Sequence, residues 1–140
     1  MRYTELRDRQ QKEWNEFPIM FAFSDEQFKE GMKKLGLNES DTDKIYHIGG
    51  GGYIRKNSAR ALEMMTDRHA RERKEAFNDD QYAYEAFLYE LGNHEYCITY
   101  ELEPTLDALG LTYDEVMGDC RLKEILKQAK RDYLASCEEY

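Results

Sequence analysis

Four consecutive glycines precede two cations in residues 47–56, HIGGGGYIRK. A glycine-rich loop can cradle a phosphate with its backbone N–H groups, and nearby cations then complete the site. The run lacks the Lys-Ser/Thr ending of a P-loop and the GxGxxG spacing, and the residues after it are typical of a strand. The sequence therefore favours a hairpin turn that uses glycine for positive φ. The alternative is a small nucleotide- or anion-binding module or enzyme centred on this hairpin (residues 49–52), with these candidate anion ligands: Gly50, Gly51, Arg55 and Lys56.

Histidine and cysteine are the other residue types that could bind a metal or act as nucleophiles. The closest two of the three histidines, His47, His69 and His94, are 22 residues apart, which is not a zinc-ligand spacing. Glu90 precedes His94 by four residues, but Gly92 is expected to end the helix between them. The sequence thus predicts structural or surface histidines, with no metal and no cofactor.

The three cysteines form no CxxC pair and are odd in number, which is typical of reduced, structural thiols rather than disulfides. Cys97 follows His94 by three residues, and in an extended strand two such side chains face opposite sides. Cys120 and Cys137 fall on the apolar stripe of the last predicted helix and are expected in the core. No catalytic residue is predicted, so the sequence favours a protein that is not an enzyme.

The charge pattern is the most informative feature for function. The chain of 140 residues has a formal net charge of −9, and residues 75–119 contain 12 acidic residues and no Lys or Arg. A solvated acidic face is the ordinary explanation for such a segment. The alternative is an acidic surface, with exposed tyrosines, that docks on a basic partner. The candidate contact residues are Asp79, Asp80, Glu85, Glu90, Glu95, Glu101 and Glu103.

The same pattern argues against other classes of function. Direct binding of DNA or RNA by this segment is disfavoured, because phosphate neutralisation needs cations. The charged N-terminus lacks a signal-peptide apolar region, and no run approaches the roughly 20 apolar residues of a membrane span. We therefore expect a protein of the cytoplasm, without membrane contact.

The elements that would position these residues follow from periodicity and capping signals. Helices are predicted over residues 4–16, 24–36, 57–77, 81–91 and 104–110, and over 112–137 with an interruption near Gly118. Strands are predicted over residues 17–23, 44–48, 52–56 and 94–102. Strands and helices do not alternate regularly, which argues against a doubly wound parallel sheet. The expected fold is a single α+β domain over residues 1–140, a small, mainly antiparallel sheet of about four short strands covered by several helices.

Four phrases together carry a resemblance that spans nearly the whole chain. They are FPIMFAFSDEQFKEGMKKLGL (17–37), DTDKIYHIGGGGYIRK (41–56), YELGNHEYC (89–97) and TLDALGLTYDE (105–115). The chain resembles a family of small acidic proteins of unknown function encoded by phages, plasmids and conjugative elements of Firmicutes and related gut bacteria. The resemblance implies no catalytic or binding residue. It implies a context, since small acidic proteins of mobile elements are often accessory or counter-defence factors, including anti-restriction and anti-CRISPR proteins that act as nucleic-acid mimics.

We therefore expect a non-enzymatic acidic binding protein of a phage or mobile element. Its partner would be the basic, nucleic-acid-binding surface of a host defence or nucleic-acid-handling protein. Two other hypotheses stay open, the anion-binding hairpin and homo-oligomerisation through the last helix.

Overall fold

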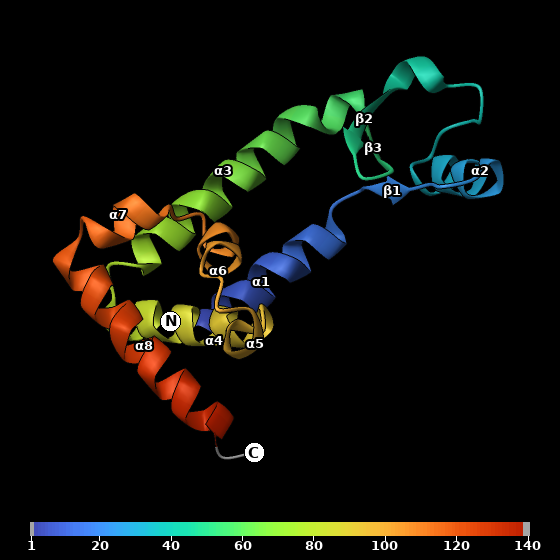
Figure 1. Ribbon diagram of the computed structural model, residues 1–140. Helices are drawn as coiled ribbons and strands as arrows, with labels where there is room; N and C mark the ends of the chain where they lie inside the picture. The colour runs from blue at the N-terminus through green and yellow to red at the C-terminus, as the bar shows by residue number, and fades with distance from the viewer. Residues whose placement is uncertain (1, 139–140) are drawn as a thin grey trace. The chain divides into compact units, whose positions relative to one another are not determined.

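The computed structural model describes residues 2–138, and within them it contains eight α-helices, two short 3₁₀ helices and three strands (Figure 1). The helices are α1 (Tyr3–Glu16), α2 (Asp25–Lys34), α3 (Ala59–Ala76), α4 (Asp80–Asn93), α5 (Tyr96–Thr99), α6 (Glu103–Ala108), α7 (Tyr113–Met117) and α8 (Cys120–Glu138). The strands are β1 (Met20–Phe21), β2 (Ile45–Gly49) and β3 (Gly52–Arg55), and the 3₁₀ helices are η1 (Thr42–Lys44) and η2 (Lys56–Ser58). The predicted α+β class with a small antiparallel sheet is confirmed, although the sheet has three strands rather than about four.

The chain divides into two compact units. The sheet unit is Arg9–Arg71, and the helical unit combines Met1–Asp8 with Glu72–Tyr140. Both divisions fall inside helices, the first within α1 and the second within α3. Whether the two units act as the single domain predicted over residues 1–140 is not decided by this division, so the single domain stays a prediction.

The sheet unit is built on the strand order β1-β3-β2, with both pairings antiparallel. The glycine run forms the β2–β3 hairpin, as predicted, and Gly49, Gly50 and Gly51 all have positive φ. A register irregularity lies between His47 and Gly49, where the strand bends into the turn. Helix α2 begins at the predicted Ser24 cap, whose hydroxyl accepts a hydrogen bond from the Gln27 N–H. The core between α2 and the sheet consists of Met20, Met32, Leu35 and Leu37.

Two glycines of the hairpin are covered by apolar side chains rather than open to a ligand. A Cβ on Gly51 would lie 2.5 Å from the Phe23 ring, and one on Gly52 would lie 3.0 Å from Ile48 and 3.1 Å from the Phe21 ring. These three apolar side chains are themselves exposed. The absence of a glycine side chain therefore lets them pack over the backbone. We call Phe21, Phe23 and Ile48 the hairpin tip.

Gly31 of α2 lies against Met20 of β1, and it allows a direct test of this packing. A Cβ at Gly31 would lie 2.5 Å from Met20 Sδ, and Met20 is only 2 % exposed and has little room to move. We expect Gly31→Ala to lower the free energy of unfolding by about 1–2 kcal/mol, because overpacking exceeds the helix-propensity gain of Ala.

Gly92 on α4 is the matched control, since its Cβ would meet only Tyr133 at 3.7 Å. Gly92→Ala should raise the free energy of unfolding by up to about 1 kcal/mol through helix propensity alone. Chemical denaturation of both variants measures the two effects. Equal signs for the two changes would contradict the packing described at Gly31.

The helical unit is organised around α4, which packs most extensively against α8 and also contacts α5 and α6. The sequence predicts α4 as a central buried helix, and six of its residues are buried. The cap of α7 is also as predicted, since the Thr112 hydroxyl accepts a hydrogen bond from the Glu115 N–H. The core contains the aromatic and aliphatic residues Tyr3, Leu6, Phe77, Tyr82, Phe87, Leu91, Tyr96, Leu106, Leu109, Val116, Leu122 and Leu126.

The strand predicted over residues 94–102 is wrong. That segment contains α5 (Tyr96–Thr99), and its backbone N–H groups bond locally, from Ile98 and Thr99 to the Glu95 carbonyl and from Tyr100 to the Tyr96 carbonyl. The three strands all lie in the sheet unit, so the described part of the helical unit offers no ladder partner. A helical turn satisfies the backbone without one, and this outweighs the β propensity of the aromatic and β-branched residues.

Among the described helices, none is both long enough and apolar enough to cross a membrane. The most apolar of the longer helices, α4, has 14 residues, whereas a span needs about 20.

Candidate functional site

Three of the seven predicted acidic contact residues have structural partners. Asp79 caps α4 by accepting a hydrogen bond from the Tyr82 N–H at 2.9 Å. Asp80 pairs with Arg121 at 2.6 Å, and Glu85 pairs with Arg2 at 3.0 Å. Both arginines lie outside residues 75–119. The negative charge of this acidic segment is therefore partly neutralised by cations from other parts of the chain.

Glu90 is a fourth predicted contact residue that is not free for a binding partner, because its side chain is buried. It is 3 % exposed, and it accepts hydrogen bonds from the Tyr3 hydroxyl at 2.6 Å and the Asn93 amide at 3.2 Å. His94 Nε2 lies 3.2 Å from the same carboxylate, because α4 runs through Gly92 and does not end there as predicted. Burial and the bond to Glu90 raise the pKa of Tyr3. Glu90 is therefore a structural carboxylate that fixes the start of α1 to α4.

The three remaining acids are exposed and flank α5. Glu95 immediately precedes this helix, and Glu101 and Glu103 follow it. Between them Ile98 is 71 % exposed and Tyr100 is 69 % exposed, so two large apolar side chains project into solvent among three carboxylates. We call residues 95–103 the α5 corner.

The backbone of the α5 corner is held in an unusual conformation. Glu95 and Tyr100 have φ of 52° and 54°, and they are the non-glycine residues with positive φ in the described chain. Such a conformation costs roughly 1–3 kcal/mol per residue and persists where surrounding contacts fix it. Here the buried Tyr96 supplies those contacts, with its ring packed edge-on against Tyr100 at 5.9 Å and near Tyr133 at 6.5 Å.

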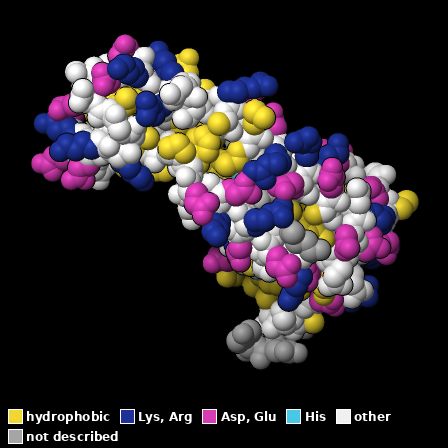
Figure 2. Space-filling view, turned by 180° about the vertical axis from the view of Figure 1, so that it is seen from behind, with side chains coloured by type: hydrophobic (Ala, Val, Ile, Leu, Met, Phe, Trp, Pro, Cys, Tyr) yellow, Lys and Arg dark blue, Asp and Glu magenta, His cyan; other side chains and the backbone are white. Residues whose placement is uncertain are grey.

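Lysines of α8 also lie in this region. Lys123, Lys127 and Lys130 line a hollow of ≈ 210 Å³ together with Leu102, Tyr113, Met117 and Leu126. Lys130 Nζ lies 5.5 Å from the centre of the Tyr96 ring. On the face drawn in Figure 2, acidic and basic side chains are interspersed. The acidic side chains on that face therefore form no continuous patch.

The predicted anion ligands of the hairpin have other partners. The Arg55 guanidinium donates to the Leu35 carbonyl at 3.1 Å, and Lys56 Nζ lies 5.2 Å from the centre of the Tyr46 ring. Both cations also line a shallow hollow of ≈ 220 Å³ together with Asp43, Lys44 and Asn57. Gly51 packs under Phe23, and a Cβ on Gly50 would meet nothing within 4 Å. The hollow that Arg55 and Lys56 line therefore does not include the glycine backbone of the hairpin.

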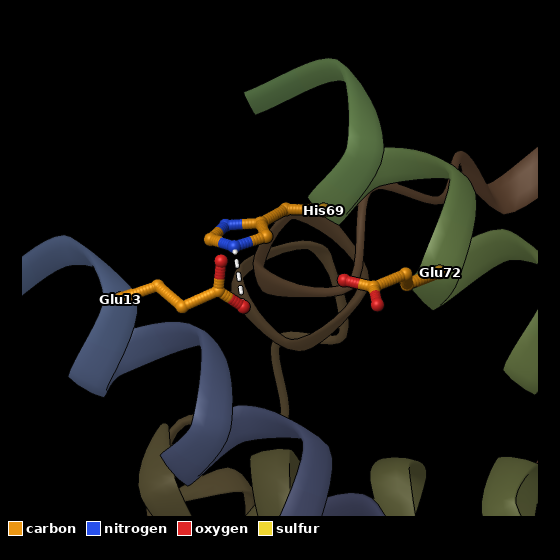
Figure 3. Close-up of side chains that lie close together, drawn as sticks. All are labelled: Glu13, His69 and Glu72. Atoms are coloured by element: carbon orange, nitrogen blue, oxygen red, sulfur yellow. Dashed lines mark ion pairs between the residues drawn. The ribbon is translucent and has the colours of Figure 1, made fainter. Parts of the chain in front are cut away.

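A second group of charged residues lies between α1 and α3, and sequence reasoning missed it. Arg68 bonds the Glu13 carboxylate through two guanidinium nitrogens and lowers the pKa of Glu13 to about 2. His69 is 1 % exposed, and its Nε2 lies 3.4 Å from Glu13 Oε1 without hydrogen-bond geometry (Figure 3). The Gln10 amide donates to the His69 carbonyl at 3.1 Å.

Glu72 follows His69 by one turn on the same helix. The Glu13 carboxylate and the His69 imidazole are ligand types that bind divalent cations. The guanidinium of Arg68 already neutralises Glu13, which opposes a second cation beside it. The spacing of His69 and Glu72 by three residues was visible in the sequence, but the pairing with Glu13 depends on the packing of two distant segments.

The other two histidines and the cysteines can also be placed. His47 is exposed and stacks on Tyr53 at 4.8 Å. Cys120 is exposed at the first position of α8, so its predicted place in the core is wrong. Cys97 and Cys137 are half-buried, and because Cys97 lies on α5, the strand argument that separated it from His94 does not apply.

Comparison with known proteins gives a family but no activity. A model described as a family of unknown function, DUF7659, matches residues 2–132. No curated protein and no solved structure matches the chain.

Proposed function

We propose that this chain, which belongs to the DUF7659 family of unknown function, is a non-enzymatic binding protein that docks its α5 corner on a basic protein surface. The observation that carries the proposal is the exposure of Ile98 and Tyr100 among the carboxylates of Glu95, Glu101 and Glu103. No Lys or Arg occurs between residues 75 and 119 to neutralise them within the segment.

This composition is typical of a protein–protein contact. Tyrosine is enriched among the residues that dominate binding energy, and such residues lie at the centre of a contact with polar residues around them. Tyr100 can also stack on an arginine guanidinium, which is a favourable contact for an exposed ring. The carboxylates around it would steer a cationic partner toward the corner and fix its orientation.

The conformation of the corner supports the same proposal. Two positive φ values on either side of a four-residue helix hold Ile98 and Tyr100 outward before any partner arrives. Strained backbone of this kind is concentrated at ligand clamps and switch regions. A preformed corner also loses less conformational entropy when it binds.

The partner that fits this chemistry is a protein with a cationic surface for nucleic acid. Such surfaces are dense in Lys and Arg because they neutralise phosphates, and the carboxylates of the corner would replace those phosphates. We propose a bacterial defence or nucleic-acid-handling protein as this partner. The chain would then be a counter-defence inhibitor of the anti-CRISPR or anti-restriction type, encoded by a phage or mobile element and active in the host cytoplasm.

The hairpin tip favours a second candidate function, self-association. Phe21 is 59 % exposed and Phe23 is 77 % exposed, and such aromatic side chains next to one another mark a contact surface. Phe21 and Phe23 also border a hollow lined by Gln27, Glu30 and Lys34, and this border of mixed charge suits a second copy of the chain. The chain would then be a structural, homo-oligomeric accessory protein.

Site-specific photo-crosslinking distinguishes the two candidates. Three variants of the full chain each carry one photoreactive amino acid, in place of Ile98, Phe23 or Met64. Each variant is expressed in the bacterium that carries the gene, and the cells are irradiated. Met64 is the matched control, because it is an exposed apolar residue on α3 outside both surfaces. We expect a defined adduct from position 98, whose partner is a nucleic-acid-binding protein, and no such adduct from position 64.

Two outcomes would contradict docking through the α5 corner. The first is an adduct of two copies of the chain from position 23 with no adduct from position 98, which would favour self-association. The second is the same set of adducts from positions 98 and 64, which would show that the corner has no specific partner.

A further inference from the structure

The hollow beside α8 in the helical unit has a lining that is partly apolar and partly cationic. Its apolar lining comes from three segments and consists of Leu102, Tyr113, Met117 and Leu126. Its cationic lining consists of Lys123, Lys127 and Lys130. No acidic side chain of residues 2–138 lines it. We call it the lysine hollow, and it gathers positive charge in a chain whose formal net charge is −9.

The sequence of α8 places the three lysines on one face of this helix. Lys123, Lys127 and Lys130 are spaced by four and then three residues, so they follow a single helical stripe. Leu126 lies on the same stripe, and it is 2 % exposed. Like charges four residues apart repel each other and destabilise a helix. An anion bound among the lysines would offset this repulsion.

The ammonium groups of the lysine hollow are not neutralised within the described chain. Among residues 2–138, no carboxylate forms an ion pair with any of the three lysines. Lys123 and Lys127 are exposed, and Lys130 Nζ lies 5.5 Å from the centre of the Tyr96 ring. The aliphatic part of a lysine packs on apolar surface while its ammonium stays in water. The hollow therefore offers apolar surface next to uncompensated positive charge.

We infer that the lysine hollow is a binding site for a small amphipathic anion, which has one short apolar chain or one ring and a single anionic head. The apolar part would contact Leu102, Met117 and Leu126, and the Tyr113 ring, which is 57 % exposed, would lie beside it. The anionic head would accept charge-assisted hydrogen bonds from the lysine ammonium groups.

The volume of the hollow limits the size of this ligand. At ≈ 210 Å³ it exceeds the roughly 150 Å³ of an apolar cavity that binds benzene, and it is below the roughly 300 Å³ at which pockets for drug-sized ligands begin. A single ring or a short chain therefore fits, whereas a nucleotide does not.

This inference does not depend on the docking proposed for the α5 corner. Among the described residues that line the hollow, Leu102 alone also belongs to the corner, and the others lie on α7 and α8. The hollow can bind an anion whether or not the corner has a protein partner.

The experiment titrates the full-length, ¹⁵N-labelled protein with octanoate and follows the backbone amide signals by NMR. We expect saturable shifts concentrated in α7 and α8, with a Kd below about 1 mM. Acetate has the same charge without the chain, and octylammonium has the same chain with the opposite charge. Neither control probe should give saturable shifts in these helices.

Substitution of the lysines tests their part in binding. Lys123→Gln/Lys127→Gln/Lys130→Gln should weaken octanoate binding by at least about tenfold, because the charge-assisted hydrogen bonds are lost. The corresponding triple substitution to Arg keeps the positive charge and should retain most of the affinity. The matched control Lys12→Gln/Lys33→Gln/Lys74→Gln removes three exposed lysines elsewhere and should leave the Kd unchanged.

Three results would overturn the inference. They are the absence of saturable shifts with octanoate, equal Kd values for octanoate and either control probe, and equal weakening by the two triple Gln variants. The comparison of the three probes uses the wild-type protein alone, so it decides the matter even where a variant does not fold.

Discussion

Glu90→Leu is expected to lower the free energy of unfolding by about 2–4 kcal/mol, although the sequence places Glu90 among candidate contact residues. The substitution removes the acceptor of the buried Tyr3 hydroxyl and the partner of Asn93 and His94. A buried hydroxyl without an acceptor keeps its desolvation penalty, and the Asn93 amide also loses its carboxylate acceptor. Urea denaturation monitored by circular dichroism measures the change.

The double variant Tyr3→Phe/Glu90→Leu separates this explanation from simple loss of a side chain. Phe retains the ring contacts of Tyr3 with Tyr82 and Tyr89 but needs no acceptor. When both partners become apolar, the penalty is largely removed, so the double variant should recover at least half of the loss. Glu103→Gln, at an exposed position, should change stability by less than about 0.5 kcal/mol. Additive losses in the double variant would contradict the role assigned to the Tyr3–Glu90 bond.

Substitutions in the α5 corner are expected to have the largest effect on binding. Ile98→Ser should weaken the complex with the partner identified by crosslinking by about 30-fold, which corresponds to about 2 kcal/mol for a central contact residue. Tyr100→Asn should have a similar effect, and Asn is suitable because it tolerates the positive φ at this position. Both changes should act mainly on the dissociation rate, measured by surface plasmon resonance.

The carboxylates of the corner should affect association instead. We expect the triple variant Glu95→Gln/Glu101→Gln/Glu103→Gln to slow association and to reduce its dependence on salt. The matched control Asp8→Asn/Glu30→Gln/Asp67→Asn changes three exposed acids elsewhere and alters the net charge by the same amount. Equal effects of the two triple variants would show that net charge, rather than the corner, determines association.

Local signals predicted much of the fold. The Ser24 and Thr112 caps, the glycine hairpin, the apolar stripe of α3 and the largely apolar circumference of α4 are encoded within a few residues of one another, and all are confirmed. The segment around α5 was predicted wrongly because its composition favours a strand, while its surroundings provide no strand to pair with. Buried Tyr96 and the two residues with positive φ fix that segment through contacts that no local pattern contains.

The candidate site was predictable only in part. The acidic segment was visible as a run without cations, but its partners Arg2 and Arg121 lie in distant parts of the sequence. The burial of Glu90 had a local signal, since it lies on a helix that is apolar around most of its circumference. The Glu13–Arg68–His69 group depends on residues 55 and 56 positions apart, and spacing alone does not predict such pairs.

The most direct measurement of the central claim is competition between this chain and nucleic acid for the partner that crosslinks at position 98. The affinity of the purified partner for the chain is measured by fluorescence anisotropy at constant salt, with increasing concentrations of the nucleic acid that the partner binds. If the α5 corner occupies the nucleic-acid-binding surface, the apparent Kd rises in proportion to the nucleic acid, and no ternary complex forms. An unchanged Kd together with a stable ternary complex would contradict the account.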